Sequence, residues 1–347
     1  MPQREAQYLH ISTWTIVRFF VVLLGIVALF AVRDILFSLI FAVIVASAVE
    51  PGIEWLKERR IPRIAGVVII YLVGLTLFFL LVYLIFPLFA EEIRTFSTSY
   101  PLLEEQIRSG IARAGTLPLI SFFAANVEGL FRIPSSYLDQ LGGSIADVAS
   151  AAFGGIFSFM LVVVFSFYLA AQEKGIDNFL RLVTPLQYEP YVLDLWRRAQ
   201  KKLGRWLRTQ MLLGAVMGVL IFFGLTILGV EHAFFFAALS ALFEIIPVVG
   251  PILAAVPAVA TAFIADPLLG IFTVGLYVAA QQVESHVIVP VIMRRTVDLS
   301  PLVVVFALLV GVKIGGIFGI LLAVPMTAIA AELLNDWDKK KRSLIPD

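Results

Sequence analysis

The sequence FEIIPVVGPILAAVP, from Phe243 to Pro257, decides how the rest of the chain is interpreted. It interrupts a long apolar region with an acidic residue, Glu244, and then with Pro247, Gly250 and Pro251. Proline removes a backbone donor and breaks a helix, and glycine permits a tight turn. At membrane depth, an unpaired backbone amide is costly unless it is buried in protein or faces a wet cavity. We therefore predict a broken helix here, with a permeation or binding site beside it.

The composition predicts a polytopic membrane protein. Of the 347 residues, 60% are hydrophobic and 15% are charged, and the mean hydropathy is +0.97. Soluble domains average about 45–50% apolar and about 25% charged residues. The net charge of +1 gives no basic field that would attract nucleic acid.

The sequence lacks the residues and motifs of most catalytic sites. Cysteine is absent and only three scattered histidines occur, so we expect no metal site and no thiol chemistry. No P-loop, HExxH or GxSxG motif is present. We therefore expect neither an enzyme nor a cofactor.

Alternating apolar and polar stretches divide the chain into about eight apolar segments, and we predict an all-α membrane protein. Within the main polar insert, apolar positions repeat at a spacing of three and four residues, which predicts amphipathic helices. Such helices either cap their own subunit or contact another subunit, and periodicity alone does not separate the two. The predicted parts are membrane spans 1–3 as a scaffold (residues 1–89), the extracytoplasmic insert (90–150), span 4 (151–171), a basic amphipathic cytoplasmic linker (172–208), a transport unit (209–334) and a basic cytoplasmic tail (335–347).

The distribution of charge predicts the topology, because Lys and Arg favour the cytoplasmic side of a membrane. Residues 50–63 carry four basic residues, and residues 172–208 carry eight basic and four acidic ones, whereas the 90–150 insert has four basic and seven acidic. Every basic cluster and both termini are cytoplasmic if residues 232–265 (hairpin A) and 301–334 (hairpin B) each enter and leave from one side. The charge rule does not distinguish re-entrant hairpins from pairs of full crossings.

This topology contains an inverted repeat. Span 5 followed by hairpin A, and span 6 followed by hairpin B, form the same unit in opposite orientations. Hairpin A turns at IPVVGP (246–251), and hairpin B turns near VKIGGIFG (312–319), where Gly315 and Gly316 interrupt the apolar run. Inverted units with broken elements near the midplane are a design of secondary transporters. We predict that the two hairpin tips meet there and enclose a site.

Few polar side chains lie in the apolar second half of the chain, and these are the candidate site residues. Intramembrane carboxylates are costly and usually face a cavity, which favours Glu244 as a cation or proton site over a carboxylate at the interface. Gln281 and Glu284 share a helical face with Ile288 and could form a third wall. His286 lies off that face and titrates near neutral pH, so a proton role is open to it.

Four segments resemble the autoinducer-2 exporter family of bacterial transporters. They are RTQMLLGAVMGVL (208–220), FEIIPVVGPILAAVPAV (243–259), QQVESHVIVPVIMRRTVDLSPLVVVFALLVG (281–311) and IFGILLAVPMTAI (317–329). The resemblance implies an inner-membrane secondary transporter with eight apolar segments that forms homo-oligomers, some of them pentamers. Some family members export the quorum-sensing signal autoinducer-2, and others exchange sodium or lithium for protons.

The resemblance also assigns individual positions. The sequence departs from the family pattern at His286, where Asn is usual, and at Thr209, where Gly is usual before Gln210. The positions that match the pattern are Pro247, Gly250 and Pro251 at the tip of hairpin A, Gln281 or Gln282 with Glu284 and Pro290 in span 6, and Pro301 and Pro325 in hairpin B.

The resulting expectation is a multi-pass transporter in the bacterial inner membrane, surrounded by lipid. Glu244 and Glu284 would bind a coupling cation or proton, and the Pro/Gly tips would offer free backbone groups to a small polar solute. Two alternatives stay open: a sodium or lithium/proton antiporter without an organic substrate, and a passive channel or membrane scaffold.

Overall fold

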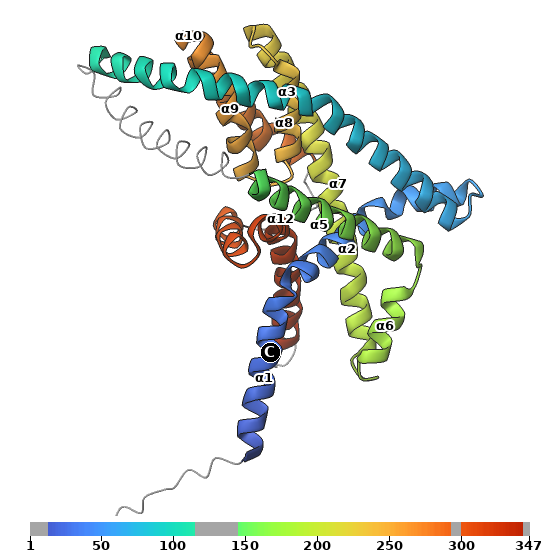
Figure 1. Cartoon of the computed structure of the whole chain (residues 1–347). Coiled ribbons are helices and arrows are strands. Elements are labelled where there is room, and N and C mark those ends of the chain that lie inside the picture. The colour runs from blue at the N-terminus through green and yellow to red at the C-terminus, as the bar shows by residue number, and fades with distance from the viewer. Residues whose placement is uncertain (1–12, 115–144, 293–299, 343–347) are drawn as a thin grey trace, which may run out of the picture.

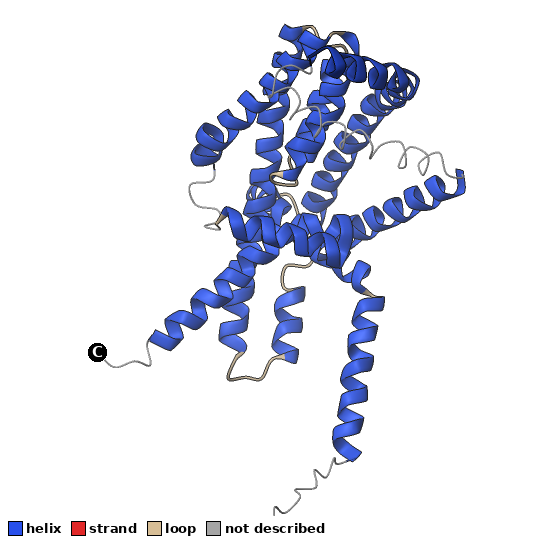
Figure 2. Ribbon diagram, turned by 90° about the vertical axis from the view of Figure 1, so that its left-hand side faces the viewer, coloured by secondary structure: helices blue, strands red, loops and turns tan. Residues whose placement is uncertain are grey.

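The structure is a computed structural model that describes residues 13–114, 145–292 and 300–342. The described residues are helical apart from short turns and loops, and they contain no strand (Figures 1 and 2). This confirms the predicted all-α class. The helices are α1 (Thr13–Ala31), α2 (Arg33–Glu58), α3 (Arg63–Ala114), α5 (Ile145–Ala171), α6 (Gly175–Val183), α7 (Glu189–Leu228), α8 (Ala233–Phe243), α9 (Val249–Ala265), α10 (Pro267–Val283), the π-helix η1 (Glu284–Ile288), α11 (Val289–Ile292) and α12 (Pro301–Arg342).

Several of these helices are long and apolar enough to cross a membrane. By length and composition the described residues contain four such helices, and five if the α5–α6 pair, which bends by 87°, counts as one span. Four shorter apolar helices accompany them: Val17–Ala31, Ala233–Phe243, Val249–Ala265 and Leu302–Gly316. The structure thus supports a multi-pass membrane protein.

Two helices continue where the sequence predicted a change of segment. The helix α3 runs for 52 residues across the predicted boundary at 89/90. The helix α7 runs for 40 residues and joins the basic linker to span 5 without a break. Charged residues end a membrane span without ending a helix, because Arg, Lys and Glu are good helix formers.

The helix α7 is the shared wall of two apolar cores. Towards its C-terminal end, Met217, Ile221 and Leu225 pack with residues of α8, α9 and α10. Nearer its N-terminal end, Trp206 and Leu207 pack with residues of α2 and α12. Small residues allow this close packing, as is common between helices in membranes.

Residues 232–265 form a helical hairpin, as the sequence predicted. Phe235 and Phe236 near the start of α8 share a core with Ala258 and Ala262 near the end of α9, so the two helices run antiparallel. The reversal occupies the five residues 244–248 between them. The predicted break at IPVVGP is confirmed in its position.

Residues 301–342 form a second hairpin inside α12. Its backbone leaves the helical region at Gly315 and Gly316, and Gly316 has φ +54°. A Cβ on Gly319 would overlap the carbonyl oxygen of Gly311, so the two arms touch through backbone at this point. The second arm reaches Arg342, beyond the predicted end at residue 334.

Candidate functional site

Glu244 directly follows α8 and is almost completely buried, with 2% of its surface exposed. Its backbone N–H donates to the carbonyl of Ser240 at 3.1 Å, which continues the helical pattern for one more residue. The end of α8 packs closely against α7, because a Cβ on Gly214 would lie only 2.5 Å from the carbonyl oxygen of Ala241 and 3.4 Å from the Cβ of Glu244. The carboxyl group is therefore enclosed by protein.

Glu284 begins the π-helix and is 8% exposed. A π-turn contains an extra residue, and such turns occur frequently at functional sites. The carboxyl groups of Glu284 and Glu244 lie close enough to interact directly with each other. Two buried carboxylates side by side repel each other, which favours a proton or a cation between them. We call Glu244 and Glu284 the carboxyl pair.

Two glutamines complete the immediate surroundings of the carboxyl pair. The side-chain amide of Gln281 donates to Oε2 of Glu284 at 2.7 Å. The amide of Gln210, on α7, donates to the backbone carbonyl of Glu244 at 2.6 Å. Gln210 is 2% exposed, and its Oε1 is buried and accepts no hydrogen bond within the described part of the chain. A buried acceptor without a partner costs free energy, so this oxygen is available to a donor or a cation.

A second polar contact lies one helical turn away. The hydroxyl of Ser240 donates to the carbonyl of Phe236 at 2.8 Å and lies 3.2 Å from the hydroxyl of Tyr277. Ser240 precedes Glu244 by four residues, and Tyr277 precedes Gln281 by four. Polar groups thus line the α8–α10 contact over two successive turns.

The tip of hairpin A is a strained turn. Val248 has φ +70° and ψ −51°, and the N–H of Val249 donates to the carbonyl of Pro247 at 2.8 Å. These values define a γ-turn of the rare, strained kind. Gly250 follows it, and a Cβ there would overlap the carbonyl oxygen of Phe243. Only glycine fits this position.

Most of the backbone amides at the tip already have partners, although the sequence suggested free backbone groups there. The N–H of Ile246 donates to Phe243 at 2.9 Å, and the N–H of Gly250 donates to Ile246 at 2.9 Å. Together with Val249, three amides at the tip have partners within the hairpin. The half-buried Pro251 begins the next turn of α9.

The structure places the two hairpin tips apart. Ile246, at the tip of hairpin A, packs against Leu308 and Ala323, which lie in the arms of hairpin B. Gly315, at the tip of hairpin B, instead lies against the ring of Phe37 on α2. Gly315 and Gly316 are therefore not brought to the carboxyl pair.

Gln282 and His286 also lie outside the carboxyl pair. Both are exposed. The Nδ1 of His286 is 3.1 Å from the carbonyl of Gln282 and 2.9 Å from the hydroxyl of Ser285. Gln281, Glu284 and Ile288 were expected to share one helical face, and the structure agrees. Gln281 bonds to Glu284, and Ile288 packs against the core beside α7.

Two members of the site were not predicted. The sequence analysis noted Gln210 only as a position of the family pattern, and it did not single out Tyr277. A buried amide in an apolar stretch of α7 and a tyrosine one turn before Gln281 were the available signals. Within the described residues, no group of three or more His, Asp or Glu side chains could hold a metal ion.

Comparisons with known proteins agree with a role in transport. A family model described as "AI-2E family transporter" matches residues 19–339. "Putative transport protein YueF" of Bacillus subtilis is 24% identical over 337 residues, which cover 91% of this chain and 90% of that protein. "Putative transport protein YhhT" of Escherichia coli is 24% identical over 330 residues, which cover 94% and 91%. The match to the family model extends over nearly the whole chain, and the chain therefore belongs to the AI-2E transporter family.

Proposed function

We propose that the protein is a secondary transporter of the bacterial inner membrane in which the carboxyl pair binds the coupling ion. The observation that carries this proposal is the proximity of two buried carboxyl groups, Glu244 and Glu284, on different helical elements. Buried carboxyl groups in a membrane protein mark ion pathways and proton relays. The pair would exchange its proton for a monovalent cation, or release it, as transport proceeds.

The surrounding groups support ion exchange at this position. A monovalent cation needs several oxygen ligands once it leaves water. The two carboxyl groups and the unpartnered Oε1 of Gln210 could supply such oxygens. Gln281 is bonded to one carboxylate and would keep it oriented through the cycle.

We further propose that hairpins A and B are re-entrant and that both termini are cytoplasmic. The basic clusters at residues 50–63, 172–208 and 339–342 support this orientation. Transport would move residues 209–334 against a scaffold of the first four spans. The γ-turn at Val248 and the π-helix after Val283 are the irregular backbone elements beside the carboxyl pair that could absorb such a movement.

The solute we propose is a small polar molecule, and autoinducer-2 is the first candidate because of the family resemblance. A sodium or lithium/proton antiporter is the second candidate, since the carboxyl pair alone would serve such an exchange. A homo-oligomer is also part of the proposal. It is supported by the apolar residues that α1 exposes along its length, where Figure 1 shows this helix standing apart from the bundle.

Flux into proteoliposomes tests the proposal. Purified protein is reconstituted, and uptake of autoinducer-2, or the internal pH change after a sodium pulse, is recorded. We expect Glu244→Gln and Glu284→Gln each to lower the coupled flux at least about tenfold, the effect of losing one charged hydrogen bond. The matched control is Glu231→Gln, which removes an exposed carboxylate just before α8. It should retain the flux.

The same experiment separates the alternatives. A sodium-driven pH change that needs Glu284 and no organic solute would identify an antiporter. Currents that do not saturate under voltage clamp would identify a channel. If both glutamine variants fold and keep the coupled flux of the unchanged protein, the carboxyl pair is not the coupling site.

A further inference from the structure

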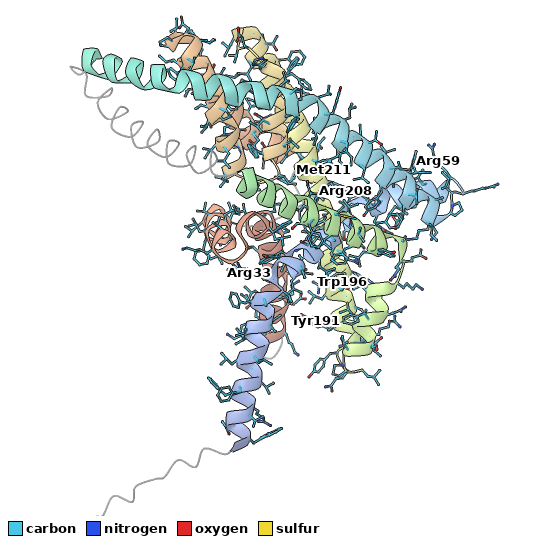
Figure 3. The ribbon with its side chains drawn as sticks, in the orientation of Figure 1. Arg33, Arg59, Tyr191, Trp196, Arg208 and Met211 are labelled. Carbon is cyan, nitrogen blue, oxygen red and sulfur yellow. The ribbon has the colours of Figure 1, made fainter. Side chains whose placement is uncertain are left out.

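A second candidate site is a cavity of about 400 Å³ lined by residues of the five helices α2, α3, α5, α6 and α7. One wall is a face of α2 that includes Ser47 and Glu50, and another is the α5–α6 connection at residues 172–177. The third is a face of α7 that runs from Trp196 to Arg208, both labelled in Figure 3. The residues of the carboxyl pair do not line this cavity, and the proposed transport function assigns it no role.

The cavity carries an excess of positive charge. Its lining contains six basic and four acidic side chains. Three of the four acidic side chains already have a cation beside them. These pairs are Glu50 with Arg63 at 2.7 and 2.9 Å, Asp177 with Arg197 at 3.2 Å, and Glu173 with Lys57 at 2.6 Å.

Two cations on the α7 wall of the cavity have no carboxylate partner among the described residues. Lys201 and Arg208 form no salt bridge within the described ranges of the chain. They lie seven residues apart on α7, which places them on one face of that helix. Glu54 is the remaining carboxylate of the lining. A multiply charged anion would therefore meet a positive surface there.

Neutral donors stand beside these cations. The indole Nε1–H of Trp196 is buried and has no hydrogen-bond partner in the described part of the protein. The helix α6 begins at the cavity with Gly175 and Ile176, and its N-cap residue, Lys174, supplies no side-chain cap. First-turn amides lack partners within their own helix, and they favour anions. Cations combined with N–H donors are how proteins recognise phosphate groups.

We propose that this cavity binds the phosphate group of an anionic ligand, with Lys201 and Arg208 as the charge contacts and Trp196 as a neutral donor. Basic pockets between membrane helices bind lipid headgroups in this way. A soluble phosphate ester has the same chemistry. The helices that form the cavity are membrane-span candidates, which places it within reach of both sources.

Binding to the purified full-length chain in a neutral detergent tests the proposal. The probes are dihexanoyl phosphatidylglycerol, its zwitterionic phosphatidylcholine analogue and glycerol 3-phosphate. The double variant Lys201→Gln/Arg208→Gln should weaken binding of the anionic probe at least about tenfold, because it removes two charged contacts. The matched control, Lys339→Gln/Lys341→Gln, removes the same charge from the tail and should change the Kd less than about twofold.

A second variant keeps all the charges. Trp196→Phe should abolish the change in tryptophan emission that accompanies binding and raise the Kd by a few fold, since an aromatic ring stays while the indole donor is lost with the five-membered ring. Saturable binding of phosphatidylglycerol alone would identify a lipid site, and additional binding of glycerol 3-phosphate would identify a general phosphate site. The proposal fails if neither anionic probe binds saturably, or if the tail variant weakens binding as much as the cavity variant.

Discussion

Hairpins A and B have the same outline and are built from different chemistry. Hairpin A reverses at a proline-containing γ-turn and carries Glu244 into a buried polar cluster. Hairpin B reverses at two glycines, and its arms meet through the backbones of Gly311 and Gly319. The comparison teaches that two helical hairpins can share a shape while the polar chemistry is concentrated in one of them.

The two hairpins are also anchored differently. Hairpin A is held by apolar packing and by the bond from Gln210. The second arm of hairpin B ends in an ionic cluster on α7, where Arg198 binds Glu332 at 2.5 Å and Asp336 at 2.6 Å. Lys202 is also paired with Glu332. We therefore expect ionic strength to affect hairpin B more than hairpin A.

The largest predicted effect comes from the glycines at which backbones touch. Gly319→Ala in hairpin B and Gly250→Ala in hairpin A should each lower the free energy of unfolding by about 3 kcal/mol or more, because the added Cβ overlaps a carbonyl oxygen. Thermal unfolding in detergent measures the loss. Gly275→Ala in α10 is the matched control, since nothing lies within 4 Å of its Cβ position. A normal melting temperature for Gly319→Ala would contradict the proposed packing of hairpin B.

The ionic cluster around Arg198 gives the next largest effect on stability. Its salt dependence distinguishes the anchoring of hairpin B from that of hairpin A. Arg198→Gln should lower the free energy of unfolding by about 1–2 kcal/mol, a discounted value because the Arg198 side chain is 32% exposed. The loss should shrink in high salt. Denaturant titrations at two salt concentrations check this, with Arg342→Gln, which removes an exposed i,i+4 pair, as the control. An equal loss in both variants would show that the cluster does not anchor the hairpin.

The strained tip of hairpin A gives a smaller effect with the opposite sign. Val248→Gly should raise the free energy of unfolding by about 1 kcal/mol, because glycine adopts a positive φ without strain and the Val248 side chain is 52% exposed. We expect transport to fall at the same time if the strain has a role in hairpin movement. Melting temperature and flux are measured on one preparation. A fall in stability would show that Val248 is not strained in the protein.

The smallest predicted effect is a loss of stability in acid. It comes from the Lys57–Glu173 pair, which lies in neither hairpin. The hydrogen bond from Lys57 holds the pKa of Glu173 below its ordinary value of 4.5. A lowered folded-state pKa stabilises the fold above about pH 4.5, and this stabilisation is lost as the pH falls through the lowered value. The parent should therefore melt at a higher temperature than Lys57→Gln at pH 7. At pH 4 or below the two melting temperatures should converge. A persistent difference there would contradict the assignment, and a transport effect near neutral pH must come from other groups.

Much of the fold could be predicted from the sequence because membrane helices are encoded locally. Long apolar runs predicted the helices, and Pro247, Gly250 and the Gly315-Gly316 pair predicted both reversals. The continuity of α3 and α7 was missed, because charge marks the end of a span more clearly than the end of a helix.

The site was predicted in part. Glu244, Gln281 and Glu284 were predicted, because a carboxylate or amide is conspicuous in an apolar segment. Gln210 and Tyr277 join the site through contacts between α7, α8 and α10, which no local pattern encodes. For the same reason the sequence placed Gly315 and Gly316 beside hairpin A, whereas the register between the hairpins leaves Gly315 against Phe37.

The length of α3 has a mechanical consequence. Its 52 residues rise by about 78 Å, more than twice the hydrocarbon thickness of a bilayer of about 30 Å. The apolar part ends at Leu88, so the 26 residues that follow form an arm of about 39 Å. Tilting this arm by about 10° at its base moves Ala114 sideways by about 7 Å, by the same helical rise. A small tilt within the membrane is thereby amplified into a displacement large enough to open or close a contact outside it.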